Sequence, residues 1–332
     1  MKSVLVTGGL GFIGSHTTVE LLNAGYRPVL LDNLSNSDTS VLDGIAAITG
    51  TKPTFYEGDF QDTSLLTRIF QDESIDAIIH FAAFKAVGES VLDPLKYYDN
   101  NVAGFIQLLQ ASEQAGIRQF IFSSTAAVYG NPPSDTVTEE TPCAPESPYG
   151  WSKYMNEIVL RDLCAANPEI SGTALRYFNV VGGHESAKIG ELPKGKPQNL
   201  LPIIVQATTG KIPPLTVYGT DYPTPDGTCL RDYIHVVDLA KAHVAALDHG
   251  KAGFHIYNIG TGNPTSVLEL IRSFEKVNNV TVPRVLGERR AGDPTAYYAI
   301  ADKAQQELDW HATKTTEDAV RDAWVWAQKS KI

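Results

Sequence analysis

The sequence predicts an α/β fold in which a doubly wound parallel sheet is joined to a smaller, irregular α/β domain. Short apolar runs alternate with helix-like segments through the first half of the chain, and the first run leads directly into a glycine-rich turn. Continuous apolar strands that alternate with helices are typical of a parallel sheet covered on both faces, the Rossmann type. The strand-like runs are 4–6, 29–31, 54–56, 77–81, 120–123 and 173–177, and the helix-like segments are 13–24, 62–71, 94–115 and 149–166.

The alternation weakens after about residue 178, which predicts a second domain. Residues 183–227 are rich in Gly and Pro and predict irregular structure, 232–237 reads as a strand followed by a helix, and 317–329 as an amphipathic closing helix. We therefore predict a dinucleotide-binding domain over 1–178, to which the chain returns at about 231–258. Residues 179–230 and 259–332 are expected to form the substrate domain.

Composition argues against several classes of function. The chain has 332 residues, 43% of them hydrophobic, and a net charge of −11, which disfavours nucleic acid and anionic membrane surfaces as partners. The three cysteines, Cys143, Cys164 and Cys229, form no Cys-x-x-Cys and read as reduced thiols, not as a disulfide framework or a metal site. No apolar stretch is long enough to span a membrane, and the N-terminus does not resemble a signal peptide, so a cytoplasmic protein is expected.

The turn after the first strand-like run carries glycines at Gly8, Gly11 and Gly14. A backbone without Cβ can turn tightly and lie against a pyrophosphate, and the helix that follows aims free N–H groups at the anion. The spacing is Gly-x-x-Gly-x-x-Gly, which departs from Gly-x-Gly-x-x-Gly, and there is no Gly-Lys-Ser/Thr of a P-loop. The turn indicates a dinucleotide site, with an ordinary strand-to-helix turn as the alternative.

The second strand-like run ends at Asp32, where a carboxylate would meet the adenosine ribose hydroxyls. Its charge would repel a 2′-phosphate, and residues 33–37 offer no Arg to receive one. The sequence therefore favours NAD over NADP; the plainer reading of Asp32 is a loop residue.

Tyr149 and Lys153 stand four residues apart after Pro148, which suits a helix start. A Lys cation beside a phenol stabilises the phenolate, so we expect a lowered Tyr149 pKa and an acid/base suited to a sugar or alcohol hydroxyl. Tyr149 is the only one of the 14 tyrosines with Lys at i+4. Thr125 follows a strand that ends in hydroxyls and could share the substrate proton. The plainer readings are a surface helix with a solvated Lys and a Thr that caps a loop.

Taken together, these motifs resemble the extended short-chain dehydrogenase/reductase family, and most closely its UDP-sugar epimerases. The resemblance runs nearly end to end. It covers residues 7–16, 31–34, 80–83, 85–90, 97–101, 147–150, 176–179, 226–228, 231–236, 289–290 and 292–293.

The resemblance implies a role for each matching residue. Tyr149 would be the acid/base, Lys153 its activator and ribose anchor, and Thr125 the hydroxyl partner, where many epimerases carry Ser. The NAD site would be formed by residues of the first domain: Gly8, Gly11, Phe12, Ile13, Gly14, Asp32, Asn33, Asp59, Phe60, Phe81, Ala82, Lys85, Asn100, Tyr149, Lys153 and Phe178. The UDP-sugar would be held by Thr125, Asn179, Asn199, Leu200, Tyr218, Arg231, Arg290, Asp293 and Tyr297. No metal ligand is expected.

The implied reaction is a redox-neutral inversion at C4 of UDP-glucose and UDP-galactose through a 4-keto sugar, with NAD resident in a homodimer. The bulk of Tyr297 would exclude N-acetylated sugars, unless it is ordinary pocket packing. A nucleotide-sugar 4,6-dehydratase or decarboxylase of the same family is the nearest rival, but Ala126 and Ala127 follow Thr125 and have no titratable group. A non-catalytic NAD-sensing protein on the same fold is the other alternative.

Overall fold

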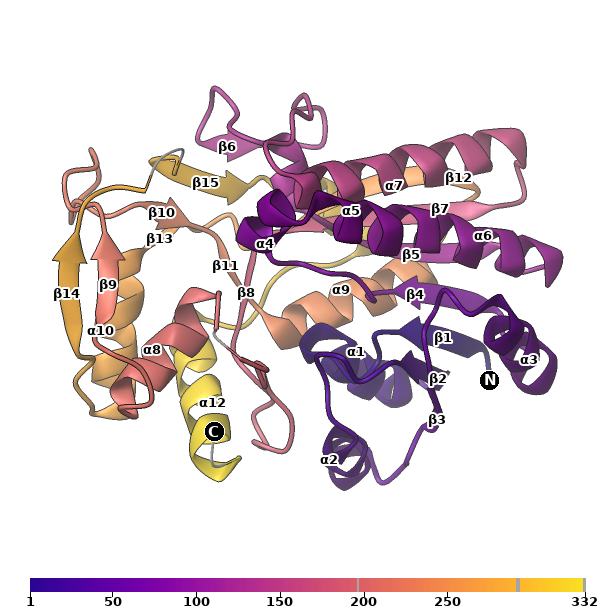
Figure 1. Cartoon of the computed structure of the whole chain (residues 1–332), viewed down its shortest axis with the longest axis horizontal. Coiled ribbons are helices and arrows are strands. Elements are labelled where there is room, and N and C mark those ends of the chain that lie inside the picture. The colour runs from indigo at the N-terminus through magenta and orange to yellow at the C-terminus, as the bar shows by residue number, and fades with distance from the viewer. Residues whose placement is uncertain (196, 291–292, 331–332) are drawn as a thin grey trace.

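A parallel sheet is the centre of the computed structural model, which describes residues 1–195, 197–290 and 293–330 (Figure 1). Within these residues the sheet has seven strands in the order β12-β7-β5-β4-β1-β2-β3. The strands are β1 (Ser3–Thr7), β2 (Arg27–Asp32), β3 (Thr54–Glu57), β4 (Ala77–His80), β5 (Gln119–Thr125), β7 (Ser171–Tyr177) and β12 (Gly253–Ile259). Gly292 of the predicted motif, and residues 196, 291 and 331–332 of the predicted second domain, lie outside the described residues.

The strand order reverses between β1 and β4, because the chain adds strands on one side of β1 and then crosses to the other. A doubly wound sheet binds its ligand at such a reversal, beyond the carboxyl ends of the strands. The predicted fold class is confirmed, and each of the six expected strands is present. The return of the chain to this sheet is β12, which pairs with β7 at the edge.

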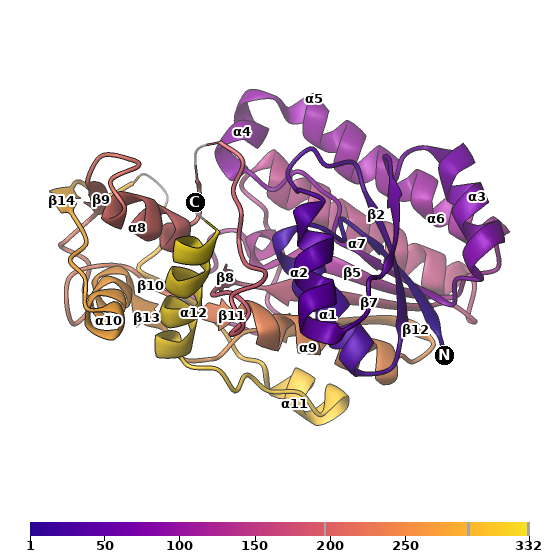
Figure 2. The same ribbon diagram turned by 90° about the horizontal axis from the view of Figure 1, so that it is seen from below.

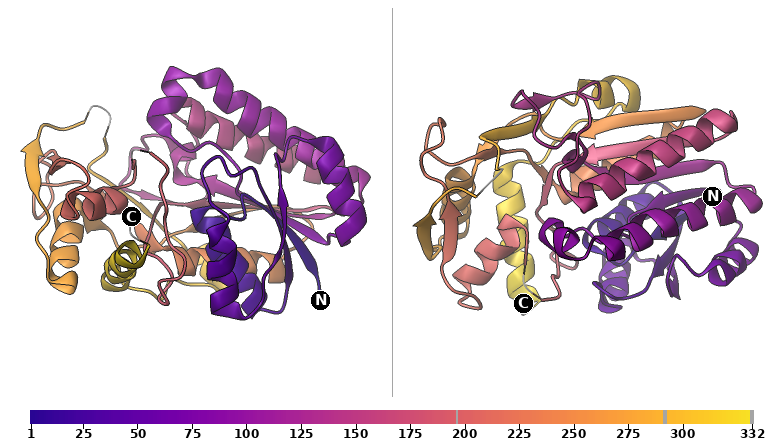
Figure 3. Two further views of the ribbon diagram at one scale, coloured as in Figure 1. Left: turned by 60° about the horizontal axis from the view of Figure 1, so that its bottom comes forward. Right: turned by 45° about the horizontal axis from the view of Figure 1, so that its top comes forward.

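Helices cover both faces of the sheet (Figure 3, left). One face carries α1 (Phe12–Asn23), α2 (Ser40–Thr49), α9 (Val236–Asp248) and α11 (Asp302–Leu308); the other carries α3 (Thr63–Glu73), α6 (Gly104–Gln114) and α7 (Pro148–Ala166). Successive strand residues point to opposite faces, so Val4 and Val6 pack in one core and Leu5 in the other. This is why the strands read as unbroken apolar runs.

The expected helix over 94–115 is confirmed, and it contains a π-helical turn that the sequence did not predict. The chain forms α4 (Val87–Leu92), α5 (Pro94–Tyr97), a π-helical turn (Tyr98–Ala103) and then α6. A π-helical turn inserts an extra residue into a helix and is often found at functional sites. Here it carries the predicted cofactor residue Asn100.

The second part of the chain lies to one side of the sheet and includes the C-terminal helix (Figures 1 and 2). Its helices are α8 (Leu200–Thr208), α10 (Val267–Asn278) and α12 (Thr316–Lys329). A mixed sheet has four strands in the order β13 (Thr265–Ser266), β10 (Leu230–Arg231), β15 (Ala296–Ala299) and β6 (Thr136–Val137). Two further sheets are parallel pairs. One pairs β8 (Asn179–Val181) with β11 (Tyr233–His235), and the other pairs β9 (Leu215–Tyr218) with β14 (Arg284–Gly287). Residues 183–227 are thus more regular than predicted, since they contain α8 and β9.

The strand predicted over 232–237 is shorter than expected. It ends at His235, whose Nδ1 accepts from the Val237 N–H at 3.1 Å and so caps α9. Val236 and Val237 therefore begin the helix. Across residues 1–195, 197–290 and 293–330, no helix combines the length and the apolar character that crossing a bilayer requires.

Candidate active site

The glycine turn joins β1 to α1, and a side chain on any of its three predicted glycines would crowd the backbone. Gly8 has a φ of +69°, and a Cβ on it would lie 2.8 Å from the Ala82 nitrogen. A Cβ on Gly14 would lie 2.2 Å from the Gly8 carbonyl oxygen, and one on Gly11 3.2 Å from the same oxygen. The turn is therefore tight enough for a pyrophosphate to approach its N–H groups, so these residues fit a dinucleotide.

Asp32 closes β2 beside this turn. Its Oδ2 accepts from the Leu10 N–H at 3.0 Å, and its Oδ1 accepts from the Leu34 N–H at 3.0 Å and the Ser37 hydroxyl at 2.6 Å. A carboxylate has roughly four acceptor positions, so about one remains for a ribose hydroxyl. Asp32 also stabilises the loop that follows it, a structural role that was not predicted from the sequence.

The ends of the next strands bring further predicted cofactor residues to the same edge. Asn33 Nδ2 donates to Asp59 Oδ2 at 2.9 Å, which links the ends of β2 and β3. Phe60 is buried, and its ring centroid lies 5.0 Å from that of His80, the last residue of β4. Phe12 and Ile13 are the first two residues of α1 and directly follow Gly11 of the glycine turn.

Beyond β4, the chain carries Phe81, Ala82 and Lys85. The Phe81 ring lies 4.7 Å from that of His243 on α9, which orients this segment. Lys85 is more than half exposed, and its Nζ lies 3.6 Å from Oε1 of Glu191. Lys85 is thus a largely exposed cation beyond the end of β4, paired with one carboxylate.

Asn101 is a site residue that the sequence analysis missed. Its side chain accepts from the Phe84 N–H at 2.9 Å and donates to the Phe84 carbonyl at 3.0 Å, and it also donates to Ser152 on α7 at 3.0 Å. The predicted residue Asn100 donates to Asn101 Oδ1 at 2.8 Å. The π-helical turn is therefore fastened both to the β4 loop and to α7; the adjacent asparagines were the available signal.

The predicted catalytic group comes together at the end of β5. The Ser147 hydroxyl accepts from the Gly150 N–H and starts α7, so that Tyr149 and Lys153 stand one turn apart on the same face. Lys153 Nζ donates to the Ser123 carbonyl at 2.8 Å. Thr125, the last residue of β5, forms a side-chain hydrogen bond with Tyr149.

The protonation of this group differs from the expectation. Burial raises the pKa of Tyr149 above its ordinary value, and only the hydrogen bond with Thr125 lowers it. Burial also lowers the pKa of Lys153 to about 7, against the opposing charge of Glu157. The prediction that Lys153 lowers the Tyr149 pKa is therefore wrong for the protein groups alone, since the Lys153 ammonium is bonded to the Ser123 carbonyl.

Glu157 lies at the centre of a second unit that the sequence analysis did not identify. Arg176 on β7 donates to its two oxygens at 2.9 and 2.5 Å, and the Ser124 hydroxyl donates to it as well. All three side chains are buried, and a bidentate ion pair offsets the cost of burying both charges. The signal was that Glu157 follows Lys153 by four residues on the same helical face.

Two of the predicted ligand residues, Tyr297 and Phe178, lie near the end of β5. Tyr297 on β15 stands beside Arg231 of β10, and its hydroxyl donates to the carbonyl of Ala126, the residue after Thr125. The Tyr297 ring centroid lies 5.3 Å from that of Phe178. The structure therefore brings Tyr297 and Phe178 together beside Ala126, the residue that follows Thr125.

The other predicted substrate residues lie on the second part of the chain. Arg231 forms an ion pair with Asp293, and the guanidinium of Arg290 lies 4.1 Å from the centroid of the Tyr218 ring. The remaining three are Asn179, exposed at the start of β8, Asn199, which precedes α8, and Leu200, which begins it.

Metal-type ligands do not gather in this region. In the part of the chain that the structure describes, no three His, Cys, Asp or Glu side chains are placed to hold a metal ion. Cys143, Cys164 and Cys229 are free thiols.

The profile of the NAD dependent epimerase/dehydratase family matches residues 4–260. A curated UDP-glucose 4-epimerase of Pasteurella multocida (strain Pm70) is 51% identical over 331 residues, which are 99% of this chain and 98% of the relative. One from Bacillus subtilis (strain 168) is 49% identical over 332 residues, with the same shares.

Solved structures are similar over the whole chain as well. The UDP-glucose 4-epimerase from Bifidobacterium longum in complex with NAD+ and UDP has a TM-score of 0.95 at 47% identity and covers 99% of both chains. The UDP-glucose-4-epimerase from Stenotrophomonas maltophila, with bound NAD and formylated UDP-arabinopyranose, has a TM-score of 0.97 at 46% identity and covers 100% of this chain and 99% of its own.

Proposed function

We propose that this chain, which belongs to the NAD dependent epimerase/dehydratase family, is an NAD-dependent isomerase that interconverts UDP-glucose and UDP-galactose by inversion at C4. The observation that carries the proposal is the meeting of Tyr149, Lys153 and Thr125 at the end of β5, at the edge where the glycine cradle lies. Full-length similarity to curated epimerases supports the same reaction.

Tyr149 is the acid/base of this mechanism. Its phenolate accepts the proton of the sugar 4-hydroxyl, and the same proton returns to O4 when C4 is reduced again. Thr125 hydrogen-bonds to the Tyr149 hydroxyl and favours its ionised form. Lys153 presents a buried ammonium one helical turn away, which Glu157 helps to keep protonated. When bound, NAD supplies the acceptor for the C4 hydride and returns it to the opposite face of the 4-keto sugar.

We assign the cofactor and substrate roles as the resemblance implies. NAD is held by Gly8, Gly11, Phe12, Ile13, Gly14, Asp32, Asn33, Asp59, Phe60, Phe81, Ala82, Lys85, Asn100, Tyr149, Lys153 and Phe178. The UDP-sugar is held by Thr125, Asn179, Asn199, Leu200, Tyr218, Arg231, Arg290, Asp293 and Tyr297. The arginines suit a diphosphate because their forked donors match its oxygens, so binding energy on UDP can anchor the substrate while the sugar turns.

The two parts of the chain bind different ligands in this proposal. Residues 1–178, with the return at about 231–258, form the NAD-binding domain of this proposal, and 179–230 with 259–332 form the UDP-sugar domain. A 4,6-dehydratase or decarboxylase is not favoured, because Ala126 and Ala127 offer no acid/base near C5 and C6. A non-catalytic NAD-sensing protein would have no use for the hydrogen-bonded Thr125 and Tyr149.

We also propose a homodimer. Exposed apolar side chains gather on α4, α5 and α7, with Val91 60%, Leu92 86% and Leu95 77% exposed, beside Trp151 and Met155. These helices contact one another in the chain, so the side chains form one apolar patch. A patch of this kind marks an interaction surface, and the matching face of a second copy would cover it.

The setting of the enzyme is proposed on similar grounds. Free thiols at Cys143, Cys164 and Cys229 suit a reducing compartment, so we place the enzyme in the cytoplasm, in galactose metabolism. The net charge of −11 disfavours nucleic acid and anionic membranes as partners.

The proposal is tested by incubating the purified protein with UDP-galactose and no added NAD. UDP-glucose is expected to form, because the hydride is returned in each turnover and the cofactor stays bound. A 4-keto-6-deoxy sugar as the product would point to the dehydratase. No turnover by a protein that binds NAD would point to the sensing role.

A further inference from the structure

A strap formed by residues 183–195 lies across the two parts of the chain. Figure 2 shows it between α12 on one side and α1 and α2 on the other. A Cβ on Gly44 of α2 would lie 2.5 Å from the Lys188 carbonyl oxygen, so strap and helix are in close contact. Ile189 is buried in the same core cluster as Leu42 of α2. Lys194 Nζ donates to the Leu34 carbonyl at 2.8 Å, two residues after Asp32.

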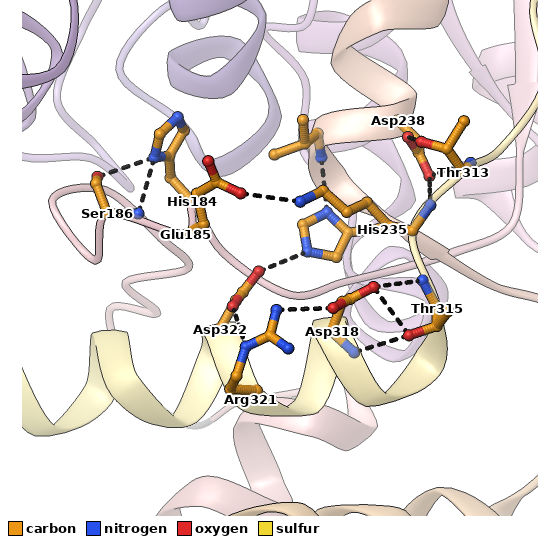
Figure 4. Close-up of polar contacts among 12 residues, drawn as sticks. His184, Glu185, Ser186, His235, Asp238, Thr313, Thr315, Asp318, Arg321 and Asp322 are labelled. Atoms are coloured by element: carbon orange, nitrogen blue, oxygen red, sulfur yellow. Dashed lines mark hydrogen bonds and ion pairs between the residues drawn. The ribbon is translucent and has the colours of Figure 1, made fainter.

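The other side of the strap is fastened to the C-terminal part of the chain (Figure 4). Lys314 Nζ donates to Glu185 Oε2 at 3.0 Å, and within the strap His184 Nδ1 hydrogen-bonds to the Ser186 hydroxyl at 2.8 Å. Farther along, Trp326 of α12 donates from Nε1 to the Glu191 carbonyl at 2.9 Å. The backbone at Glu191 is thus held in one place.

The Glu191 side chain joins two residues that the proposed function assigns to different ligands. Its Oε1 accepts from Asn199 Nδ2 at 3.0 Å, and the Nζ of Lys85 lies 3.6 Å from the same oxygen. The Glu191 side chain is only 14% exposed. Burial raises its pKa, whereas the charge of Lys85 and the Asn199 amide lower it, so its partners favour the carboxylate.

The Asn199 side chain makes this contact in place of the capping bond that is usual at its position. It occupies the N-cap position of α8, where an Asn side chain usually accepts from the first turn of the helix. Its side chain makes no such bond and donates to Glu191 instead. The amide is therefore positioned by Glu191, not by the helix that it precedes.

We propose that Glu191 is a positioning residue that couples the two ligand sites, so that a bound UDP group slows the loss of NAD. The proposal rests on the proposed function, in which Lys85 faces the cofactor and Asn199 the UDP-sugar. The Glu191 carboxylate holds both side chains. The ligand that binds first therefore orders this carboxylate, and the second ligand binds to a site that is already ordered. Such coupling is reciprocal, so NAD must strengthen UDP binding by the same factor.

This coupling would serve a reaction in which the hydride leaves the sugar and returns later. The cofactor must not escape while the 4-keto sugar turns, and throughout that interval the UDP group stays bound. A link from the UDP side to Lys85 holds the cofactor most firmly when it carries the hydride. The strap itself also spans from the Asp32 loop to Asn199, so its ordering is shared by both ligands.

The test measures NAD release from the holoenzyme into an excess of alcohol dehydrogenase and ethanol, followed at 340 nm, with and without saturating UDP. In the wild type, UDP should slow release by roughly fivefold or more, within the usual range of coupling between sites. Glu191→Gln keeps the side-chain size and can still accept from Asn199, but it loses the charge that attracts Lys85. It should reduce the UDP effect to less than twofold. Asn199→Ser breaks the link from the other side and should do the same.

Glu185→Gln is the matched control, because Glu185 lies on the same strap and is exposed at 69% beside Lys314. It should keep the wild-type UDP effect. An unchanged effect in Glu191→Gln, or an equal loss in Glu185→Gln, would overturn the coupling role. A wild-type enzyme that epimerises but shows no UDP effect would also overturn it and leave the function intact, whereas absence of epimerisation would count against the function itself.

Discussion

Replacing Gly14 by alanine should weaken NAD binding through the backbone alone. A Cβ at this position would lie 2.2 Å from the Gly8 carbonyl oxygen and 3.0 Å from the Gly9 Cα. An ordinary contact is about 3.5 Å, so the start of α1 must move away from β1 by roughly 1 Å. That displacement separates the N–H groups of α1 from the pyrophosphate. Losing one hydrogen bond to a charged group costs about 1.5–3 kcal/mol, which is roughly 10- to 150-fold in NAD affinity.

The assay is the fraction of purified protein that carries NAD, measured by chromatography after denaturation, together with the Kd for added NAD. Gly88→Ala is the control, since Gly88 is an exposed residue of α4 whose Cβ would meet nothing within 4 Å. It should keep its NAD and become more stable by at most roughly 0.5–1 kcal/mol, the difference in helix propensity between Gly and Ala. A Gly14→Ala variant with the NAD content and Kd of the wild type would refute the reasoning.

Four further predictions concern the chemistry and the assembly. Tyr149→Phe should lower kcat by roughly 10²- to 10⁴-fold with UDP affinity unchanged by calorimetry; near-normal turnover would exclude Tyr149 as the acid/base. Thr125→Val removes the hydrogen bond that lowers the Tyr149 pKa, so the phenolate forms at higher pH and the rising limb of kcat/KM against pH moves upward, whereas Thr125→Ser should leave it in place. Tyr297→Ser opens the pocket beside Phe178 and should raise turnover of UDP-N-acetylglucosamine relative to UDP-glucose by roughly 10-fold or more; a wild type that already uses both equally would contradict this. Leu92→Glu with Leu95→Glu places charges in the apolar patch and should give monomers by sedimentation, and an unchanged mass would remove the patch as the dimer face.

The elements predicted well are those whose signal is local. Each expected strand of the main sheet lies within an observed one or within a residue of it, because apolar runs between helices mark a sheet buried on both faces. The π-helical turn within the 94–115 helix was not predictable in this way. It depends on Asn101, which bonds to the backbone of Phe84, 17 residues away in sequence. Only the folded arrangement supplies that partner.

The site shows the same division. Tyr149 and Lys153 could be identified because one helical turn relates them, and Gly8 and Gly14 because the turn itself dictates glycine. Glu191 could not, since it acts on Lys85, more than a hundred residues earlier. The pKa of Tyr149 was predicted in the wrong direction for the protein groups, because burial dominates and the Lys153 ammonium is bonded to Ser123. Spacing gives the neighbour along a helix but not the burial of either group.

The central claim is that the hydride taken from C4 is returned to the same carbon by a cofactor that stays bound throughout each turnover. It is tested by incubating the purified enzyme, without added NAD, with UDP-glucose deuterated at C4 in ordinary water. The account predicts UDP-galactose that retains the deuterium at C4 in essentially every molecule, at a rate unchanged when NAD is added. Loss of the label to solvent, or turnover only after NAD is supplied, would contradict it.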